Sequence, residues 1–308
     1  MSGPVRPAET AYENDPCAEI EARRGRAATV GGVDIVRVLP TAGRRTVGPW
    51  CFVDLIRPID AEQPDPMEVG PHPHIGLATV TWLFEGEAEH TDSLGTVQLI
   101  RPGELNLMSA GHGIAHAELG MGRSLRGAQM WVAQPEGTRH GAPAFGHHSD
   151  LPRFEIGPTE GTVILGSLGG VTSPAPTEWA TVGCDLALRS GPVEIPVRAG
   201  HEHALVPIDV PVLVGATVVE PGWLGLIPSG AESVRLDAPS GAARALLIGG
   251  EPLGERIQMW WNFVARTREE ITAAWRDWDA GNTDRFGPVP SQLDRIDAPA
   301  PPWPAKDR

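Results

Sequence analysis

Short apolar runs, each ended by glycine or proline, repeat along most of this sequence and limit the folds open to it. Runs such as VGGVDIVRVLP and VGPWCFVDLI, between residues 30 and 56, are rich in β-branched residues and shorter than most helices. The chain contains 37 Gly and 31 Pro, the residues that most often punctuate strands with turns. The pattern therefore predicts an all-β protein built from many short strands.

The same layout of strands and turns occurs twice, so we expect two β domains of similar length. The first covers residues 26–135 and the second residues 154–280; residues 136–153, with several prolines and glycines, are expected to link them. Residues 1–25 are polar and lack periodicity, which predicts a flexible N-terminus. Residues 281–308 form a proline-rich tail that is expected to be extended or disordered.

One short helix is predicted, close to the end of the second domain. The segment Thr267-Arg268-Glu269-Glu270 is a capping box, in which the first and last side chains satisfy each other's backbone N–H groups. Four apolar residues follow at helical spacing on one face, which we expect to pack on a barrel: Ile271, Ala274, Trp275 and Trp278.

Charge, cysteine content and hydropathy limit the class of protein. A net charge of −14 argues against direct binding to nucleic acid, which requires basic surface to neutralise phosphates. Cys17, Cys51 and Cys184 are too few and too widely spaced for a disulfide framework or a zinc motif, as is typical of a reducing compartment. Because the N-terminus has no apolar signal segment and no run of 18 apolar residues occurs, we expect a cytoplasmic protein without membrane spans.

Two short pairs of donor residues stand out between Gly70 and Glu118. His72 and His74 are two residues apart, as are His116 and Glu118, and residues at this spacing in a strand point to the same face about 6.5 Å apart. If the two strands are neighbours, three imidazoles and one carboxylate converge. Such mixed nitrogen and oxygen donors suit a divalent transition metal.

The clearest strand, Ala78–Phe84, follows the first donor pair directly. Counting by twos from His74 puts Val80, Trp82 and Phe84 on the ligand side, which predicts an apolar wall behind the metal. That assignment holds only if no bulge shifts the register between the histidines and the strand.

Two tandem antiparallel barrels with a metal in one mouth describe a bicupin. The motifs HPHIGLATVTWLFEGEAEHTDSLG and PGELNLMSAGHGIAHAE resemble the signature of the pirins, a bicupin family, and the similarity runs through QMWVAQP to GGEPLGERIQMWWNFVARTREEI. It covers residues from about 30 to 280. The resemblance implies iron bound by His72, His74, His116 and Glu118, and a second cupin domain without metal.

The pirin resemblance also implies activities. Some pirins open the flavonol quercetin with O₂, and animal members act as nuclear co-regulators of transcription. Two positions depart from the common pattern, His112 where many members have Arg and Ala78 where many have Glu. Neither is a ligand position in the family, so the departures concern the fit of the substrate.

The other histidines have simpler interpretations. His112 lies in a glycine-flanked loop, where a substrate contact and an ordinary loop residue are equally plausible readings. His90 is expected to be structural. His201 and His203 form a second HxH pair at the head of the second domain, but no histidine or cysteine follows them, so that barrel is expected to be degenerate.

The leading hypothesis is a cytoplasmic quercetin 2,3-dioxygenase-like oxidoreductase acting on a flavonol-like substrate and O₂. Fe²⁺ is the expected cofactor, with Mn, Ni, Cu, Co or Zn as alternatives, and His116 and Glu118 are the expected catalytic residues. The predicted substrate pocket is formed by Trp82, Phe84, Met108 and His112. Two alternatives stay open: a metal-containing regulator that binds a partner enzyme or transcription factor, and a structural bicupin whose metal only stabilises the fold.

Overall fold

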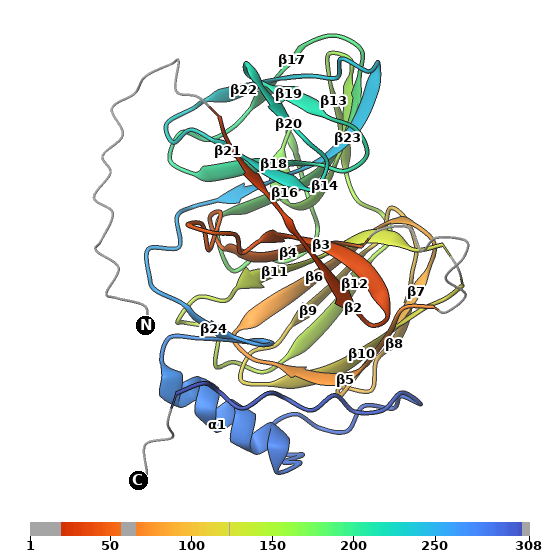
Figure 1. Cartoon of the computed structure of the whole chain (residues 1–308), viewed down its shortest axis with the longest axis vertical. Coiled ribbons are helices and arrows are strands. Elements are labelled where there is room, and N and C mark those ends of the chain that lie inside the picture. The colour runs from red at the N-terminus through yellow and green to blue at the C-terminus, as the bar shows by residue number, and fades with distance from the viewer. Residues whose placement is uncertain (1–19, 57–65, 123, 304–308) are drawn as a thin grey trace.

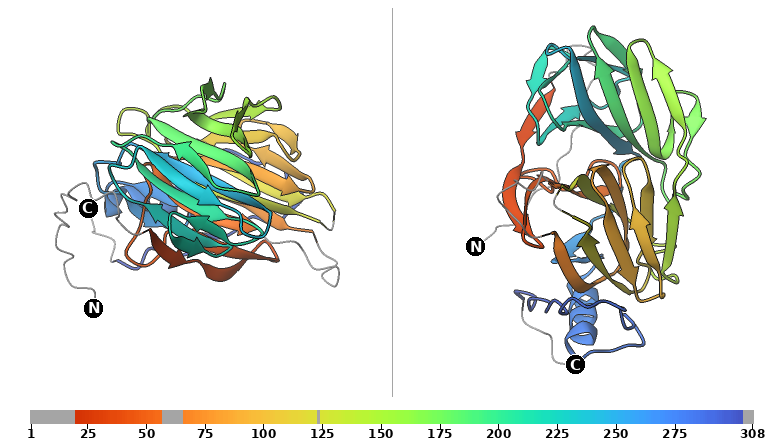
Figure 2. Two further views of the ribbon diagram at one scale, coloured as in Figure 1. Left: turned by 90° about the horizontal axis from the view of Figure 1, so that it is seen from above. Right: turned by 90° about the vertical axis from the view of Figure 1, so that its right-hand side faces the viewer.

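The computed structural model describes residues 20–56, 66–122 and 124–303, which form two β-sandwich halves stacked end to end (Figure 1). Each half packs a large sheet against a four-stranded sheet, and the two sandwiches are seen side-on in Figure 2. The sheets do not close into cylinders, so each half is a two-sheet jelly roll. The prediction of an all-β protein with two β domains and one short helix near the end of the chain is confirmed.

The first half contains the donor pairs. Its large sheet has, in order across the sheet, β12 (Ala144–His148), β9 (Leu105–Ser109), β6 (Leu77–Glu85), β11 (Arg126–Ala133), β4 (Trp50–Ile56), β3 (Val33–Leu39) and β2 (Arg26–Val30). Its small sheet has β5 (Glu68–His74), β10 (Ile114–Gly120), β7 (Ala88–Asp92) and β8 (Val97–Ile100).

The second half repeats this strand order. Its large sheet has β1 (Glu21–Arg24), β21 (Trp223–Ile227), β18 (Glu202–Pro207), β23 (Ala242–Gly250), β16 (Thr181–Arg189), β14 (Thr159–Leu168) and β13 (Arg153–Ile156), with β15 (Val171–Thr172) paired to β14. Its small sheet has β17 (Val193–Pro196), β22 (Ser233–Asp237), β19 (Val212–Val214) and β20 (Thr217–Val219). By position in this order, β17 and β22 correspond to β5 and β10.

The two halves exchange edge strands, which corrects two sequence-based boundaries. Residues 21–24, predicted to be flexible, form β1 at the edge of the second half, and the chain crosses to the first half at Gly25. A Cβ at Gly25 would lie 2.4 Å from the carbonyl oxygen of Gly222, so only glycine permits this close crossing. The predicted linker, residues 136–153, contains β12, which extends the first large sheet beside β9. The expected flexibility of residues 1–19 lies outside the described residues.

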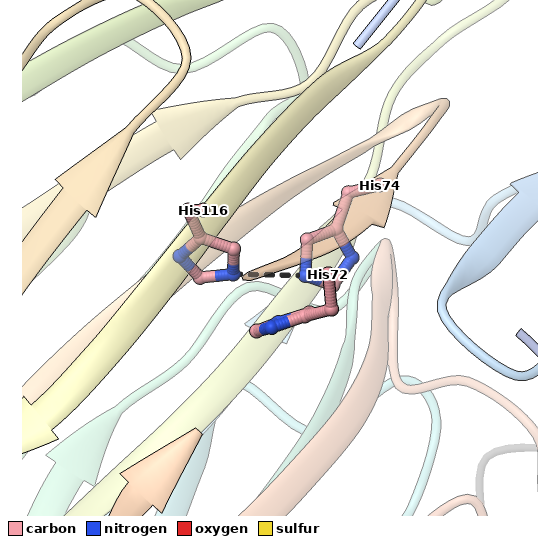
Figure 3. A group of neighbouring side chains, drawn as sticks. All are labelled: His72, His74 and His116. Carbon is pink, nitrogen blue, oxygen red and sulfur yellow. Dashed lines mark hydrogen bonds between the residues drawn. The ribbon is translucent and has the colours of Figure 1, made fainter. Parts of the chain in front are cut away.

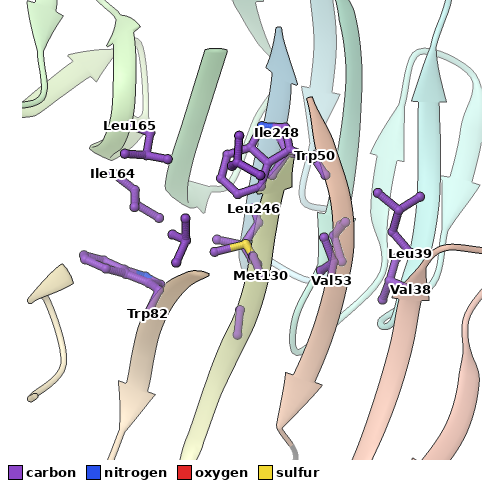
Figure 4. Packing of buried hydrophobic residues seen from close by; sticks show 14 of the residues in the cluster. Val38, Leu39, Trp50, Val53, Trp82, Met130, Ile164, Leu165, Leu246 and Ile248 are labelled. Carbon is purple, nitrogen blue, oxygen red and sulfur yellow. The ribbon is translucent and has the colours of Figure 1, made fainter. Parts of the chain in front are cut away.

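A shared hydrophobic core joins the halves (Figure 4). The indole of Trp50 is fully buried there and donates hydrogen bonds to the carbonyls of Val182 and Gly249 in the second half. Trp82 likewise donates across the boundary to Asp185, at 2.8 Å. Because β6 is covered on both faces, its residues 77–83 are all buried, Thr79 and Thr81 included, and burial does not alternate along the strand.

After β23 the chain returns to the far end of the first half (Figure 1). It forms a hairpin of β24 (Gln258–Trp260) and β25 (Phe263–Ala265), and then α1 (Arg268–Asp279). The predicted capping box at Thr267 is confirmed, and such a cap stabilises a helix by about 1 kcal/mol. In the described part of the chain no helix is long and apolar enough to cross a membrane.

The helix and the tail belong to the first half, in contrast to the predicted domain boundaries. The buried face of α1 packs with Ile75 and Ala115 of the first half in one apolar cluster. Residues 281–303 lack regular secondary structure but are not detached, because the N–H of Ile296 donates to the carbonyl of Pro71 in β5. The indole of Trp278 donates to the carbonyl of Ile296, which ties α1 to the same segment.

Candidate metal centre

The strands that carry the two donor pairs are neighbours, which meets the condition for the donors to converge. β5 and β10 pair antiparallel with His72 opposite His116. β5 is the edge of its sheet, so Pro71 and Pro73 remove no ladder hydrogen bond on the outer side. Because side chains two residues apart in a strand share a face, both histidines of β5 point toward the interior of the first half.

Three imidazoles converge on one point (Figure 3). The Nε2 atoms of His74 and His116 lie 3.0 Å apart, and the ring of His72 has its centroid 4.3 Å from that of His116. All three side chains are buried. Together they form a group able to hold a metal ion.

The hydrogen-bond partners of the rings assign the tautomers. Nδ1 of His72 donates to the carbonyl of Gly70 at 2.9 Å, and Nδ1 of His74 donates to the carbonyl of Asn262 at 3.1 Å. In each ring the proton on Nδ1 leaves Nε2 with a free lone pair.

His116 obtains the same tautomer through His90, which was predicted to be structural. Nε2 of His90 lies 3.1 Å from Asp92, and Nδ1 of His90 lies 3.3 Å from Nδ1 of His116. If His90 donates to the carboxylate, its Nδ1 accepts from His116, whose Nε2 lone pair then faces that of His74. Two lone pairs at 3.0 Å repel unless a cation lies between them, so the donor set fits a divalent metal.

Burial keeps the three rings neutral. Desolvation lowers the pKa of His72 to about 4, and lowers the pKa values of His74 and His116 well below the usual range. Neutral imidazole is the form that binds a metal.

Glu118 is close to this group but is offset by a bulge. The pairing of β10 with β5 shifts register between His116 and Glu118. The carboxylate belongs to a second group of possible ligands, with His90 and His116, and lies 3.5 Å from the hydroxyl of Thr81. Burial raises the pKa of this carboxyl. Of the four predicted ligands, the three histidines converge, and the carboxylate of Glu118 lies beside them in the second group.

A cavity of about 340 Å³ opens onto His72, His74 and Glu118. Its wall includes Phe52 and Trp131, whose rings stack at 3.9 Å between centroids. The volume lies within the range of pockets that enclose small organic ligands.

Two charged residues bring polarity to the same cavity. Arg37 binds Asp54 through two hydrogen bonds of 2.7 and 2.6 Å, and its guanidinium lies over the ring of Phe52. The pair is mostly buried and lines the cavity with Gln129. Burial raises the pKa of Asp54 against the opposing effect of Arg37.

The predicted apolar wall of Val80, Trp82 and Phe84 is wrong. These side chains lie on the opposite face of β6, in the core between the halves. Gly76 causes the error: its φ of +64° turns the chain between β5 and β6 and shifts the alternation by one residue.

The other two predicted pocket residues also lie elsewhere. Met108 packs with Ala110 and Ile114 in a separate apolar cluster. His112 is exposed, and its Nδ1 bonds to the carbonyl of Gly141. None of the four predicted pocket residues lines the cavity at the histidines.

The hairpin β24–β25 supplies cavity residues that local sequence patterns did not reveal. Trp261 and Asn262 form its turn and line the cavity, 188 residues from His74. Trp261 adopts a φ of +51°, which is unfavourable for a large side chain and marks a conformation imposed by its surroundings. For His90 a signal did exist, because His90 and Asp92 are a third pair at strand spacing, opposite Glu118 and His116.

Within the described residues, the second half has no counterpart of the histidine group. The corresponding strands β17 and β22 present buried apolar side chains to their own core, namely Val193, Ile195, Val234 and Leu236. His201 and His203 lie at the start of β18, which corresponds to β6, and therefore not at the ligand positions.

The fold and the histidine group together define a two-domain cupin protein able to hold a metal. The family model named Pirin matches residues 32–132, and the model of the Pirin C-terminal cupin domain matches residues 184–287. This chain therefore belongs to the pirin family.

Individual relatives agree with this membership. The protein of Pseudomonas aeruginosa named "Putative quercetin 2,3-dioxygenase PA1205" is 41% identical over 90% of this chain and 89% of its own length. A pirin-like protein of Caulobacter vibrioides is 37% identical over 82% of this chain and 90% of its own. The crystal structure of quercetin 2,3-dioxygenase from Acinetobacter baumannii has a TM-score of 0.87 at 37% identity, covering 94% of this chain and 97% of that one.

Proposed function

We propose that this protein is a metal-dependent dioxygenase that opens flavonol-type substrates with O₂. The observation that carries the proposal is the convergence of three Nε2 lone pairs beside a cavity walled by stacked aromatic rings. The names of the similar proteins from Pseudomonas aeruginosa and Acinetobacter baumannii support the choice of quercetin-like compounds.

The proposed ligands are His72, His74, His116 and Glu118, and the proposed metal is Fe²⁺, with Mn, Ni, Cu, Co or Zn as alternatives. A bound ferrous ion would supply Lewis-acid and redox chemistry toward O₂. The carbonyls of Gly70 and Asn262 hold two of the rings in the tautomer and orientation that ligation needs.

The cavity walls suit a flat phenolic molecule. Trp131, which is backed by Phe52, offers aromatic surface in the cavity against which a planar ring system can stack. Asp54 uses one hydrogen bond on each oxygen for Arg37, so each oxygen keeps a lone pair that can accept from a phenolic hydroxyl. These residues would bind and orient the substrate, and the apolar part of the lining would limit the entry of water.

The proposed catalytic residues are His116 and Glu118, from the same strand. Glu118 lines the cavity, so its carboxylate is the group available to take the proton of a flavonol hydroxyl. Thr81 would orient that carboxylate from the neighbouring sheet through its hydroxyl.

The test measures O₂ uptake with quercetin, using purified protein reloaded with Fe²⁺. His116→Ala should abolish uptake, and His147→Gln serves as the matched histidine control because His147 bonds to Asn106 on another sheet. A folded, iron-loaded protein that consumes no O₂ would refute the dioxygenase assignment. The regulatory alternative, a metal-containing protein that binds a partner, would then become the leading hypothesis.

A further inference from the structure

A second cavity, of about 520 Å³, opens in the other half of the molecule. It lies where the loop after β17 enters β18, and the turn between β14 and β15 forms its opposite side. Its polar lining includes Arg198, His201 and His203. This cavity is separate from the histidine group of the first half, and nothing in the proposed dioxygenase reaction uses it.

His203 is a buried side chain without a hydrogen-bond partner. Only 4% of its surface is exposed, and its ring stacks on that of His201 at 5.9 Å between centroids. Within the described residues neither of its ring nitrogens forms a hydrogen bond, although it lines the cavity. The ring nitrogens of His203 are therefore free to bond to a molecule in the cavity.

The charge of the lining indicates that a ligand of this cavity would be an anion. Among the described residues, the only titratable ones that line this cavity are Arg198 and the two histidines, although the chain carries 39 acidic residues against 25 basic ones. Two carboxylates are nearby. Glu202 is bound to the backbone N–H of Gly48 and to Arg44, and Glu251 is not part of the lining.

Arg198 is free to receive an anion. It is exposed and forms no ion pair with any described residue. Burial lowers the pKa of both histidines, and the charge of Arg198 lowers it further, so the guanidinium acts on both rings. A neutral imidazole still carries one N–H donor, and a guanidinium has several.

Part of the remaining lining is apolar, and such surface suits an organic ligand better than a bare ion. Leu168, Val171, Val182 and Val197 contribute hydrocarbon surface. We propose that this cavity is a binding site for a small organic carboxylate, whose anionic group bonds to Arg198 and His203 and whose apolar body lies against these side chains.

The experiment is isothermal titration calorimetry on the full-length, metal-loaded protein with benzoate. Benzyl alcohol tests the need for charge, and inorganic phosphate tests whether any oxyanion suffices. Arg198→Gln removes the exposed cation without disturbing the core, and Arg235→Gln is the matched control, an exposed arginine of the same half outside the lining.

We expect millimolar or tighter binding of benzoate, weaker binding of the alcohol, and a loss of about tenfold or more in affinity for Arg198→Gln but not for Arg235→Gln. His203→Gln should also weaken benzoate. Absence of benzoate binding, equal affinity in wild type and Arg198→Gln, or binding of phosphate without benzoate would each overturn the proposal. Quercetin turnover is measured in a separate experiment, so one proposal can fail without affecting the test of the other.

Discussion

Nδ1 of His74 donates to the backbone carbonyl of Asn262, a residue 188 positions later in the chain, at 3.1 Å. The hairpin that carries Asn262 follows the entire second half, yet it returns to orient a histidine of the first. The C-terminal segment, which packs on the first half, therefore contributes to the candidate metal centre.

Loss of the hairpin's anchor should weaken metal binding. Phe263 is fully buried beside Asn262, and Phe263→Ala should lower the free energy of unfolding by about 3–5 kcal/mol and the iron affinity by about tenfold or more. Phe154→Ala is the control, since Phe154 is buried in the second half and should cost similar stability. Metal titration of both variants gives the comparison. Equal iron affinities would show that the hairpin does not orient His74.

His90 should act as a positioning residue for His116. His90→Gln removes the link between His116 and Asp92, and we expect metal affinity to fall about 10–100-fold. His147→Gln should leave the affinity unchanged. The readout is a competition titration with a chelator, which does not depend on turnover. Unaltered affinity in His90→Gln would mean that the ring of His116 is held by other contacts.

Trp82 should matter for stability and not for substrate binding. Trp82→Phe removes the hydrogen bond to Asp185 while Arg244 still pairs with that carboxylate, so about 1 kcal/mol of unfolding free energy should be lost. Trp131→Phe, in the cavity wall, should instead raise KM for quercetin. Denaturant unfolding and steady-state kinetics on both variants separate the two roles. A raised KM for quercetin in Trp82→Phe would indicate that Trp82 contacts the substrate, as the sequence predicted.

The two described cysteines should be unreactive in the folded protein. Burial raises the pKa of Cys51 to about 12 and also raises the pKa of Cys184, so at pH 8 only about one Cys51 in ten thousand is a thiolate. Alkylation followed by peptide mass spectrometry should label neither residue until the protein is unfolded in guanidinium. Labelling of either in the native state at the unfolded rate would contradict their burial.

His203 should make stability depend on pH below neutrality. Its pKa is lowered from 6.5 to about 4, mainly by burial, with His201 and Arg198 adding repulsion. Between those values the unfolded chain binds a proton that the folded chain does not, so stability is full above pH 6.5 and falls as pH decreases toward 4.

The corresponding measurement compares denaturant unfolding of wild type and His203→Gln from pH 7 to 4. Wild type should lose at most about 1.4 kcal/mol per pH unit more than the variant. Piperazine buffer avoids carboxylates and phosphate, which could occupy the second cavity. Parallel pH profiles for the two proteins would show that His203 titrates normally.

Local patterns alone identified the three histidines that the structure brings together. The pairs at 72/74 and 116/118 are two residues apart, and the two-residue period of a strand is a property of the backbone that needs no tertiary information. The capping box at Thr267 was correct for the same reason, because all its hydrogen bonds lie within one helical turn.

The assignment of side chains to a strand face failed where counting by twos passed through a turn. Counting by twos from His74 through Gly76 put Trp82 on the wrong face, since one residue in a left-handed turn reverses the alternation of the whole strand. Composition misjudged the tail as well. Prolines indicated irregular backbone, which is correct, but the docking of Ile296 on Pro71 depends on contacts that composition does not encode.

The sequence by itself determined the all-β class, the duplicated strand layout and which histidines are candidate donors, because these follow from local periodicity and residue chemistry. Only the tertiary structure decided which strands exchange between the halves, which rings wall the cavity, and that Asn262 and His90 contact His74 and His116. Those relationships join residues far apart in the chain. They depend on how the sheets pack, which the spacing of residues along a strand does not specify.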